Sequence, residues 1–92
     1  SSRVIKRFRV SCGGYSATQV DIRVILREAL LSRAVNIILC HNHPSGNKQP
    51  SRDDDRLTQA VATGAKMMNL RFLDHVIIAG NDYYSFADEG KI

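Results

Sequence analysis

Two segments of the chain place apolar residues three and four positions apart, which is the spacing of an amphipathic helix. We predict the first helix over residues 21–33, with either Asp21 or a box that starts at Thr18 as its N-terminal cap. We predict the second over residues 52–69, with three consecutive aspartates in its first turn, at the positive end of the helix dipole. The apolar stripes that define these helices are Ile22, Ile25, Leu26, Ala29 and Leu30, and Leu57, Ala60, Val61, Gly64 and Met68.

Shorter apolar runs predict strands, because they are too short for helices. They span residues 4–10, 36–40, 72–79 and 83–86. The first reads as an edge or twisted strand, since Lys6 breaks its alternation. The third reads as a central strand that Asp74 and His75 interrupt, and the fourth pairs back on it as a hairpin. Helix followed by strand, repeated, is typical of an α/β layer fold.

The size and composition of the chain fit one soluble globular domain. Its 92 residues are enough for a modest core, and 43% of them are hydrophobic and 24% charged. No apolar run has the length of a membrane span, and no signal-peptide pattern is present, so we expect no membrane association. The chain opens inside a strand-like pattern, which predicts a fragment of a longer protein.

Cysteine usage and charge add little to this picture. Cys12 and Cys40 are too far apart for a C-x-x-C motif, so we predict free thiols and a cytoplasmic location. The net charge is +4. Basic residues near the start could contact nucleic acid or guard an exposed strand edge, and both interpretations stay open. These residues are Arg3, Lys6, Arg7 and Arg9.

Two histidines follow the predicted strand at residues 36–40. Because side chains alternate between the faces of a strand, His41 and His43 share one face. The helix that begins near Ser51 could bring a carboxylate of its first turn back towards the two imidazoles. Two neutral nitrogens and one carboxylate oxygen suit a catalytic zinc that keeps its fourth position for water.

The segment from Ser51 to Asp54 has two compatible interpretations. Ser-x-x-Asp ahead of a helical pattern is a capping box, with Ser51 as the cap and Asp54 in the third helical position. A carboxylate in that position can also point out of the helix end towards a metal ion. The nearby His75 reads as a core histidine, with a supporting role behind a metal ligand as the alternative. Cys40 should face away from His41, as a small core residue.

The spacing His-x-His, seven residues, Ser, two residues, Asp is met by His41, His43, Ser51 and Asp54. This pattern resembles the signature of the JAB/MPN (JAMM) zinc metalloproteases. The motif His-Asn-His-Pro-Ser-Gly, with Leu-Asp-His later in the chain, resembles the sequences of their bacterial RadC-like branch. The resemblance covers essentially the whole chain and implies a single cytidine-deaminase-like α/β domain over residues 1–92, with a mixed sheet flanked by helices. It also implies Zn²⁺ held by His41, His43 and Asp54, with Ser51 beside the oxyanion position.

One catalytic group that the resemblance implies has no match in this chain. The family's general base is a glutamate on an early strand, upstream of the segment where the chain starts. Glu28, in the first predicted helix, and Glu89, in the C-terminal turn, do not match that position. We interpret this as truncation, with the first strand missing, and predict that the 92-residue chain binds zinc but hydrolyses peptides poorly or not at all.

The leading hypothesis is a zinc-dependent metallopeptidase domain that hydrolyses a peptide or isopeptide bond in a protein substrate by metal-activated water. The alternative is a non-catalytic module that binds DNA or a protein partner. It rests on the basic N-terminal residues and on the former DNA-repair label of the RadC-like branch. The chain lacks the His-Glu-x-x-His helix of zincins and the Cys-x-x-Cys of zinc deaminases. A missing first strand would leave a sheet edge free for pairing, so the oligomeric state is open.

Overall fold

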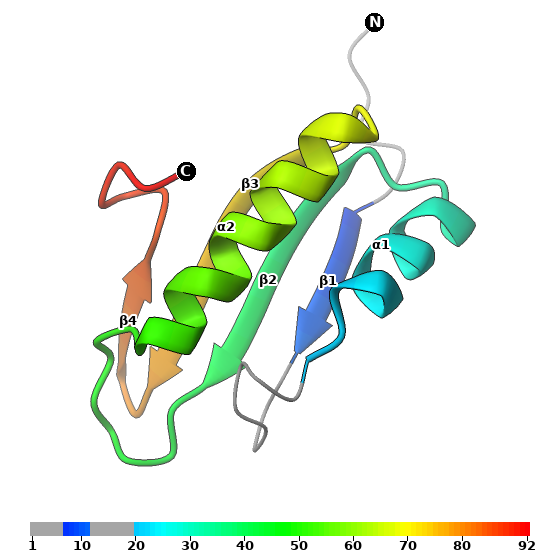
Figure 1. Cartoon of the computed structure of the whole chain (residues 1–92). Helices are drawn as coiled ribbons and strands as arrows, with labels where there is room; N and C mark the ends of the chain where they lie inside the picture. Colours follow the sequence, from blue (N-terminus) through cyan, green and yellow to red (C-terminus); the bar gives the residue numbers. More distant parts are fainter. Residues whose placement is uncertain (1–6, 12–19) are drawn as a thin grey trace, which may run out of the picture.

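Strands and helices alternate along the chain in the computed structural model, which describes residues 7–11 and 20–92. This alternation confirms the predicted α/β layer fold (Figure 1). The elements are β1 (Arg7–Ser11), α1 (Ile22–Leu31), β2 (Asn36–Asn42), α2 (Arg52–Met67), β3 (Arg71–Ala79) and β4 (Asp82–Ser85).

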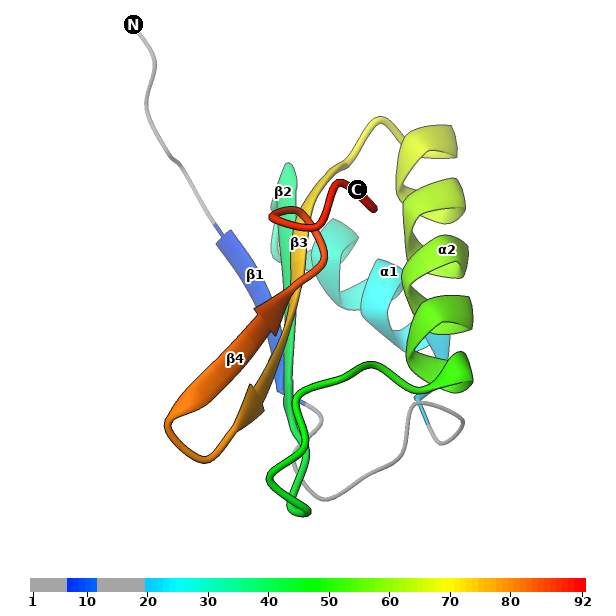
Figure 2. The same cartoon turned by 90° about the vertical axis from the view of Figure 1, so that its left-hand side faces the viewer.

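The strands form one mixed sheet in the order β1-β2-β3-β4. β1, β2 and β3 run parallel to one another, and β4 pairs antiparallel with β3. Each parallel step moves in the same direction across the sheet, so right-handed crossovers place both helices on one face. Figure 2 shows α1 and α2 together on that face. Ligand sites in such sheets form beyond the carboxyl ends of the parallel strands.

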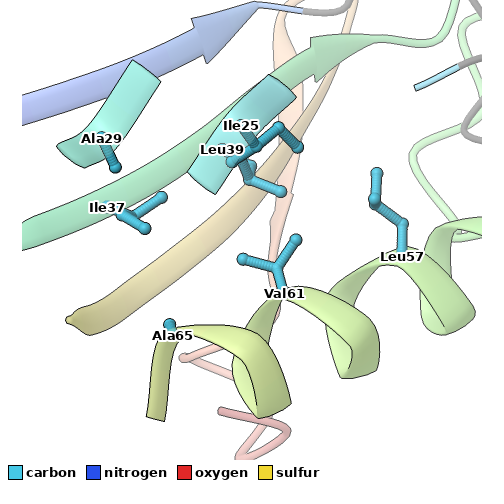
Figure 3. Packing of buried hydrophobic residues seen from close by; sticks show 7 residues of the cluster. All are labelled: Ile25, Ala29, Ile37, Leu39, Leu57, Val61 and Ala65. Atoms are coloured by element: carbon cyan, nitrogen blue, oxygen red, sulfur yellow. The ribbon is translucent and has the colours of Figure 1, made fainter. Parts of the chain in front are cut away.

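The main core lies between the two helices and β2 (Figure 3). Its buried side chains are Ile25 and Ala29 of α1, Ile37 and Leu39 of β2, and Leu57, Val61 and Ala65 of α2. Burial alternates along β2, and the inward row continues from Leu39 to His41. Cys40 has the opposite parity, as predicted, but it is only half-buried rather than a core residue, since neither described helix covers that face of the sheet.

Both helices end about two residues before the predicted limits. Each is followed by a non-glycine residue in the left-handed region, Arg33 and Asn69, both with φ of 57°. A residue in this conformation ends a helix. At the other end of α1, Asp21 is the cap and accepts a hydrogen bond from the Arg23 backbone N–H. The alternative cap, Thr18, lies outside the described residues, as do residues 4–6 of the first predicted strand.

Within residues 20–92, neither helix combines the length and the apolar character that crossing a lipid bilayer requires.

β2 continues to Asn42, two residues beyond the predicted strand, so His41 lies within the sheet. The predicted hairpin of β3 and β4 is confirmed, with Ile77 opposite Tyr84.

A one-residue shift of register occurs between β2 and β3. Ile37 pairs with Phe72, but the next residue, Ile38, pairs with Asp74, so Leu73 is an extra residue in β3. Because side chains alternate along a strand, the extra residue places His75 on the same side as Phe72. His75 is fully buried there, whereas Leu73 is exposed. The two polar residues that interrupt the apolar pattern of the sequence, Asp74 and His75, therefore come directly after this extra residue.

Candidate metal centre

Two histidines and one aspartate meet where β2 ends and α2 begins. His41 is the second-last residue of β2, and Asp54 lies in the first turn of α2. His43 follows the strand, and its backbone N–H donates to the Ile78 carbonyl at 2.9 Å. This hydrogen bond continues the β2–β3 ladder past the end of β2 and fixes the backbone that carries the second imidazole.

The turn after His43 supplies a hydrogen-bond partner for one nitrogen of its imidazole. The Gly46 N–H donates to the His43 carbonyl at 3.1 Å, and Gly46 has φ of 81°, which favours glycine. The turn brings the Asn47 carbonyl oxygen to 2.8 Å from His43 Nδ1. The other ring nitrogen, Nε2, therefore points away from the turn, towards α2.

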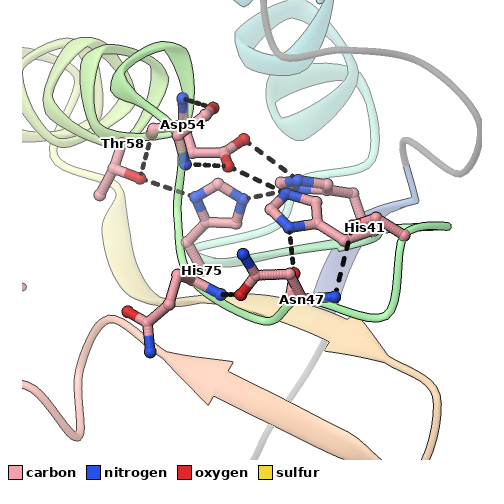
Figure 4. A network of polar contacts seen from close by, with 9 residues as sticks. His41, Asn47, Asp54, Thr58 and His75 are labelled. Carbon is pink, nitrogen blue, oxygen red and sulfur yellow. Dashed lines mark hydrogen bonds and ion pairs between the residues drawn. The ribbon is translucent and has the colours of Figure 1, made fainter.

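The imidazoles of His41 and His43 converge on the Asp54 carboxylate. Figure 4 shows His41 and Asp54 facing one another. His41 Nε2 lies 3.1 Å from Oδ1, and His43 Nε2 lies 3.0 Å from Oδ2. One donor atom from each of the three residues lies within 4.8 Å of the others. In a tetrahedral zinc site with bonds of about 2.0–2.1 Å, neighbouring donor atoms are about 3.3 Å apart. The three predicted ligands therefore form a group that can hold a metal ion.

Ser51 and Asp54 form the predicted capping box at the start of α2. Ser51 Oγ accepts from the Asp54 backbone N–H at 3.0 Å, and Asp54 Oδ2 accepts from the Ser51 backbone N–H at 2.8 Å. The same carboxylate faces both imidazoles, so both interpretations of this segment hold at once. Because Ser51 Oγ accepts from the backbone, its hydroxyl keeps a proton to donate.

Replacing Ser51 with alanine is expected to lower the free energy of unfolding by about 0.5–2 kcal/mol, because the N-cap is lost. The matched variant is Ser51→Asn, which removes the hydroxyl but keeps an oxygen that can cap the helix. We expect its stability to stay close to that of the wild type in urea unfolding without metal. An equal loss in both variants would contradict the capping role.

A model of the RadC-like JAB domain family matches residues 1–91. The chain belongs to this family. Relatives named UPF0758 protein include one from Porphyromonas gingivalis, 47% identical over 94 aligned residues that cover all of this chain and 41% of the relative. Another, from Flavobacterium johnsoniae, is 42% identical over 90 residues, which cover 98% of this chain and 39% of the relative. The chain thus spans about 40% of the length of these relatives.

Family membership supports the predicted JAB/MPN α/β fold, and the sheet and helices described above agree with it. In the sequence, neither glutamate of the chain matches the position of the family's general base, and neither joins the group of potential ligands within residues 20–92. Glu28 lies on α1 and contacts Arg27, while Glu89 lies in the C-terminal turn. The described residues thus supply potential metal ligands without a glutamate beside them.

Burial and hydrogen bonding set the charges of the RadC-like centre. Burial raises the pKa of Asp54, but hydrogen bonds from Ser51 and the adjacent imidazoles outweigh it, so the pKa is lowered. Asp54 is therefore an anion at neutral pH. Burial lowers the pKa of His41, with Asp54 opposing and His43 adding to the shift. Burial likewise lowers the pKa of His75 to about 4, so this ring is neutral.

The contacts of His43 require a positive charge between its ring and the carboxylate. Its Nδ1 faces the Asn47 carbonyl, which can only accept, so Nδ1 carries a proton. A neutral imidazole has one N–H, so Nε2 then presents a lone pair to Asp54 Oδ2, another acceptor. Either a second proton or a metal cation must lie between them. This need for a cation fits the donor set of a metal site.

His41 is hydrogen-bonded to a second group of buried side chains, of which the sequence indicated only His75. His41 Nδ1 is 2.9 Å from His75 Nε2, and His75 Nδ1 is 2.7 Å from Thr58 Oγ1. His75 is a buried core residue, as first interpreted, and it also contacts His41, as the alternative required. Thr58 was not anticipated. Its position four residues after Asp54, on the same face of α2, was the available signal.

Proposed function

We propose that this domain holds Zn²⁺ through His41, His43 and Asp54, as the metal centre of a hydrolase acting on peptide or isopeptide bonds. The observation that carries the proposal is the convergence of two imidazole Nε2 atoms on one buried carboxylate, at 3.1 and 3.0 Å. Three protein ligands of this kind are typical of catalytic zinc, which keeps one position open, whereas structural zinc has four protein ligands.

The donor set also supports zinc over other common cations. Mg²⁺ and Ca²⁺ prefer oxygen ligands, and here two of the three donor atoms are imidazole nitrogens. Imidazole and carboxylate suit a borderline cation such as Zn²⁺. Asp54 supplies the negative charge, and its capping box keeps the carboxylate in place at the helix end.

The protein groups around the site have separate tasks. When bound, zinc supplies a Lewis acid and lowers the pKa of the water that it binds. Ser51 can donate a hydrogen bond from its hydroxyl to an oxyanion that develops on the substrate carbonyl, a role typically worth roughly 10²–10³ in rate. Proton transfer from water to the leaving amine needs a general base, and neither glutamate of the chain stands at the centre. We therefore expect the 92-residue chain to bind zinc with little turnover.

The test combines metal content, an open-position probe and turnover. We expect one zinc per chain by elemental analysis after dialysis, and near-background cleavage of a fluorogenic peptide. We expect acetohydroxamate, a small zinc-binding group, to bind the zinc-loaded chain in calorimetry and not the zinc-free chain or the His43→Ala variant. Absence of zinc would overturn the metal centre, and no hydroxamate binding would indicate a closed, non-catalytic site. Rapid peptide cleavage would overturn the expected lack of a base.

The DNA- or protein-binding alternative depends on residues that the structure describes only in part. Arg3 and Lys6 lie outside the described residues, and Arg7 and Arg9 lie on β1, for which the backbone is described. No contact among residues 20–92 favours this alternative over the metal centre. We keep the hydrolase as the proposed function.

We also propose a cytoplasmic setting for the domain. Cys40 is a half-buried free thiol on β2. Free thiols persist in reducing compartments, where glutathione and thioredoxin keep them from forming disulfides. Fractionation of the native host cells, with the protein in the soluble fraction, would support this assignment.

A further inference from the structure

We infer that His75 and Thr58 are positioning residues that keep the proton of His41 on Nδ1, so that Nε2 is free to bind metal. The inference rests on the metal site proposed above. The three side chains form a continuous line from the centre into the interior (Figure 4). His41 and Thr58 are each 3% exposed and His75 is fully buried, so water does not compete for these hydrogen bonds.

This line of hydrogen bonds begins at the Thr58 hydroxyl, which has a single proton to donate. Thr58 Oγ1 donates to the Asp54 backbone carbonyl at 2.8 Å, and a carbonyl oxygen can only accept. The single hydroxyl proton of Thr58 is therefore committed to α2. Its oxygen then accepts from His75 Nδ1, 2.7 Å away. This assigns the one proton of the neutral His75 ring to Nδ1.

The remaining proton positions follow in order. With its proton on Nδ1, His75 has a lone pair on Nε2 and accepts from His41 Nδ1 at 2.9 Å. The proton of His41 is then on Nδ1, and Nε2 faces Asp54 Oδ1 at 3.1 Å with a lone pair. Metal-binding histidines commonly donate their other ring N–H to a fixed partner in this way. Here the partner is a second imidazole.

The reverse order of protons would block the site. If the Thr58 hydroxyl turned to His75 Nδ1, His75 would donate from Nε2 to His41 Nδ1. His41 would then carry its proton on Nε2, directed at Asp54 Oδ1, and that nitrogen could not bind a metal. The Asp54 carbonyl, by accepting from Thr58, favours the competent order. Asp54 thus contributes its carboxylate to the centre and its carbonyl to the tautomer of a neighbouring ligand.

Packing keeps the His75 ring in the plane that this line requires. The ring stacks on Phe86, with centroids 4.8 Å apart and planes 6° from parallel. The backbone N–H of Phe86 donates to the His75 carbonyl at 3.0 Å. The ring therefore cannot turn without disturbing the small core cluster formed by Ile77, Tyr84 and Phe86.

The test replaces the hydroxyl while keeping the shape of the side chain. Thr58→Val removes the oxygen that accepts from His75, and we expect the zinc dissociation constant to rise roughly 10–100-fold. Thr58→Ser restores the hydroxyl and should bind zinc like the wild type. Thr63→Val makes the same change at an exposed position of α2 and should leave zinc binding unchanged.

A nitrogen-15 NMR measurement of the imidazoles reads the tautomer directly, which a merely structural role would not change. With zinc bound, we expect the His75 proton of the wild type on Nδ1, facing Thr58. Without zinc, we expect a larger population with the His41 proton on Nδ1 in the wild type than in Thr58→Val. The inference would be overturned if the wild type binds zinc and Thr58→Val binds it with equal affinity. It would also be overturned if Thr58→Ser loses as much affinity as Thr58→Val. A His75 proton on Nε2 in the zinc-loaded wild type, a measurement that needs no variant to fold, would overturn it as well. Failure of the wild type to bind zinc would instead overturn the proposed function.

Discussion

Replacing Asp54 with asparagine is expected to raise the zinc dissociation constant roughly 10²–10³-fold. Four-ligand zinc sites bind with about 10–16 kcal/mol, so one ligand contributes about 2.5–4 kcal/mol. Asparagine keeps the size of the side chain and an oxygen that can accept from Ser51, but it removes the negative charge. Asp54 is 1% exposed, so solvent cannot replace the lost interaction with the cation.

The matched control is Asp53→Asn, which makes the same change in charge at the preceding residue. The Asp53 side chain is 40% exposed and lies 3.7 Å from Arg56, away from the group of potential ligands. A competition titration against a chromophoric chelator measures both constants. We expect Asp53→Asn to match the wild type, and equal affinities in all three proteins would contradict the assignment of Asp54.

Zinc is expected to raise the Tm of the domain by about 10–20 °C when free zinc is about 100 times its Kd. At that ratio, a ligand that binds only the folded state adds about 2.7 kcal/mol to the free energy of unfolding. For a domain of this size, each kcal/mol moves the Tm by about 4–8 °C. The three ligands come from β2, the following turn and α2, so the ion would bind the folded arrangement and not the separated segments.

The control for this prediction is His43→Ala, measured by scanning calorimetry with zinc and with excess chelator. The His43 side chain is 19% exposed, so its removal disturbs packing less than a change at His41, which is 3% exposed. We expect its Tm without metal to stay near that of the wild type and its zinc-dependent rise to disappear. A rise as large as that of the wild type would show that zinc stabilises the chain at another place.

The helices could be predicted from the sequence because their apolar stripes repeat every three to four residues over several turns. Their last residues were placed too late, although the asparagine after α2 was an available signal. Both helices are followed by a residue in the left-handed region, and at these places the chain has Arg33 and Asn69 rather than the usual glycine. Arginine carries no such signal, so the apolar spacing alone extended α1 too far. The end of β2 was missed for a related reason, since His41 and Asn42 are polar but still belong to the ladder.

The potential metal ligands of the candidate centre could be predicted because their spacing along the chain is fixed. His41, His43 and Asp54 lie at set distances along the chain, and a strand followed by a helix brings such positions together. Asn47 could not be foreseen, because it acts through its backbone carbonyl, which every residue has. The contact between His41 and His75 depends on how β3 pairs with β2, and a single sequence does not contain that register.

The extra residue in β3 has a consequence for how the length of this domain can vary. A chain without Leu73 would pair Phe72 and Asp74 with consecutive residues of β2, and His75 would still face inwards. Loss or gain of one residue after His75 would instead turn every later side chain of β3 to the other face. Ile77 would then leave the core. Leu73 therefore marks a point where a deletion can be tolerated, and natural or engineered length variants should be sought there.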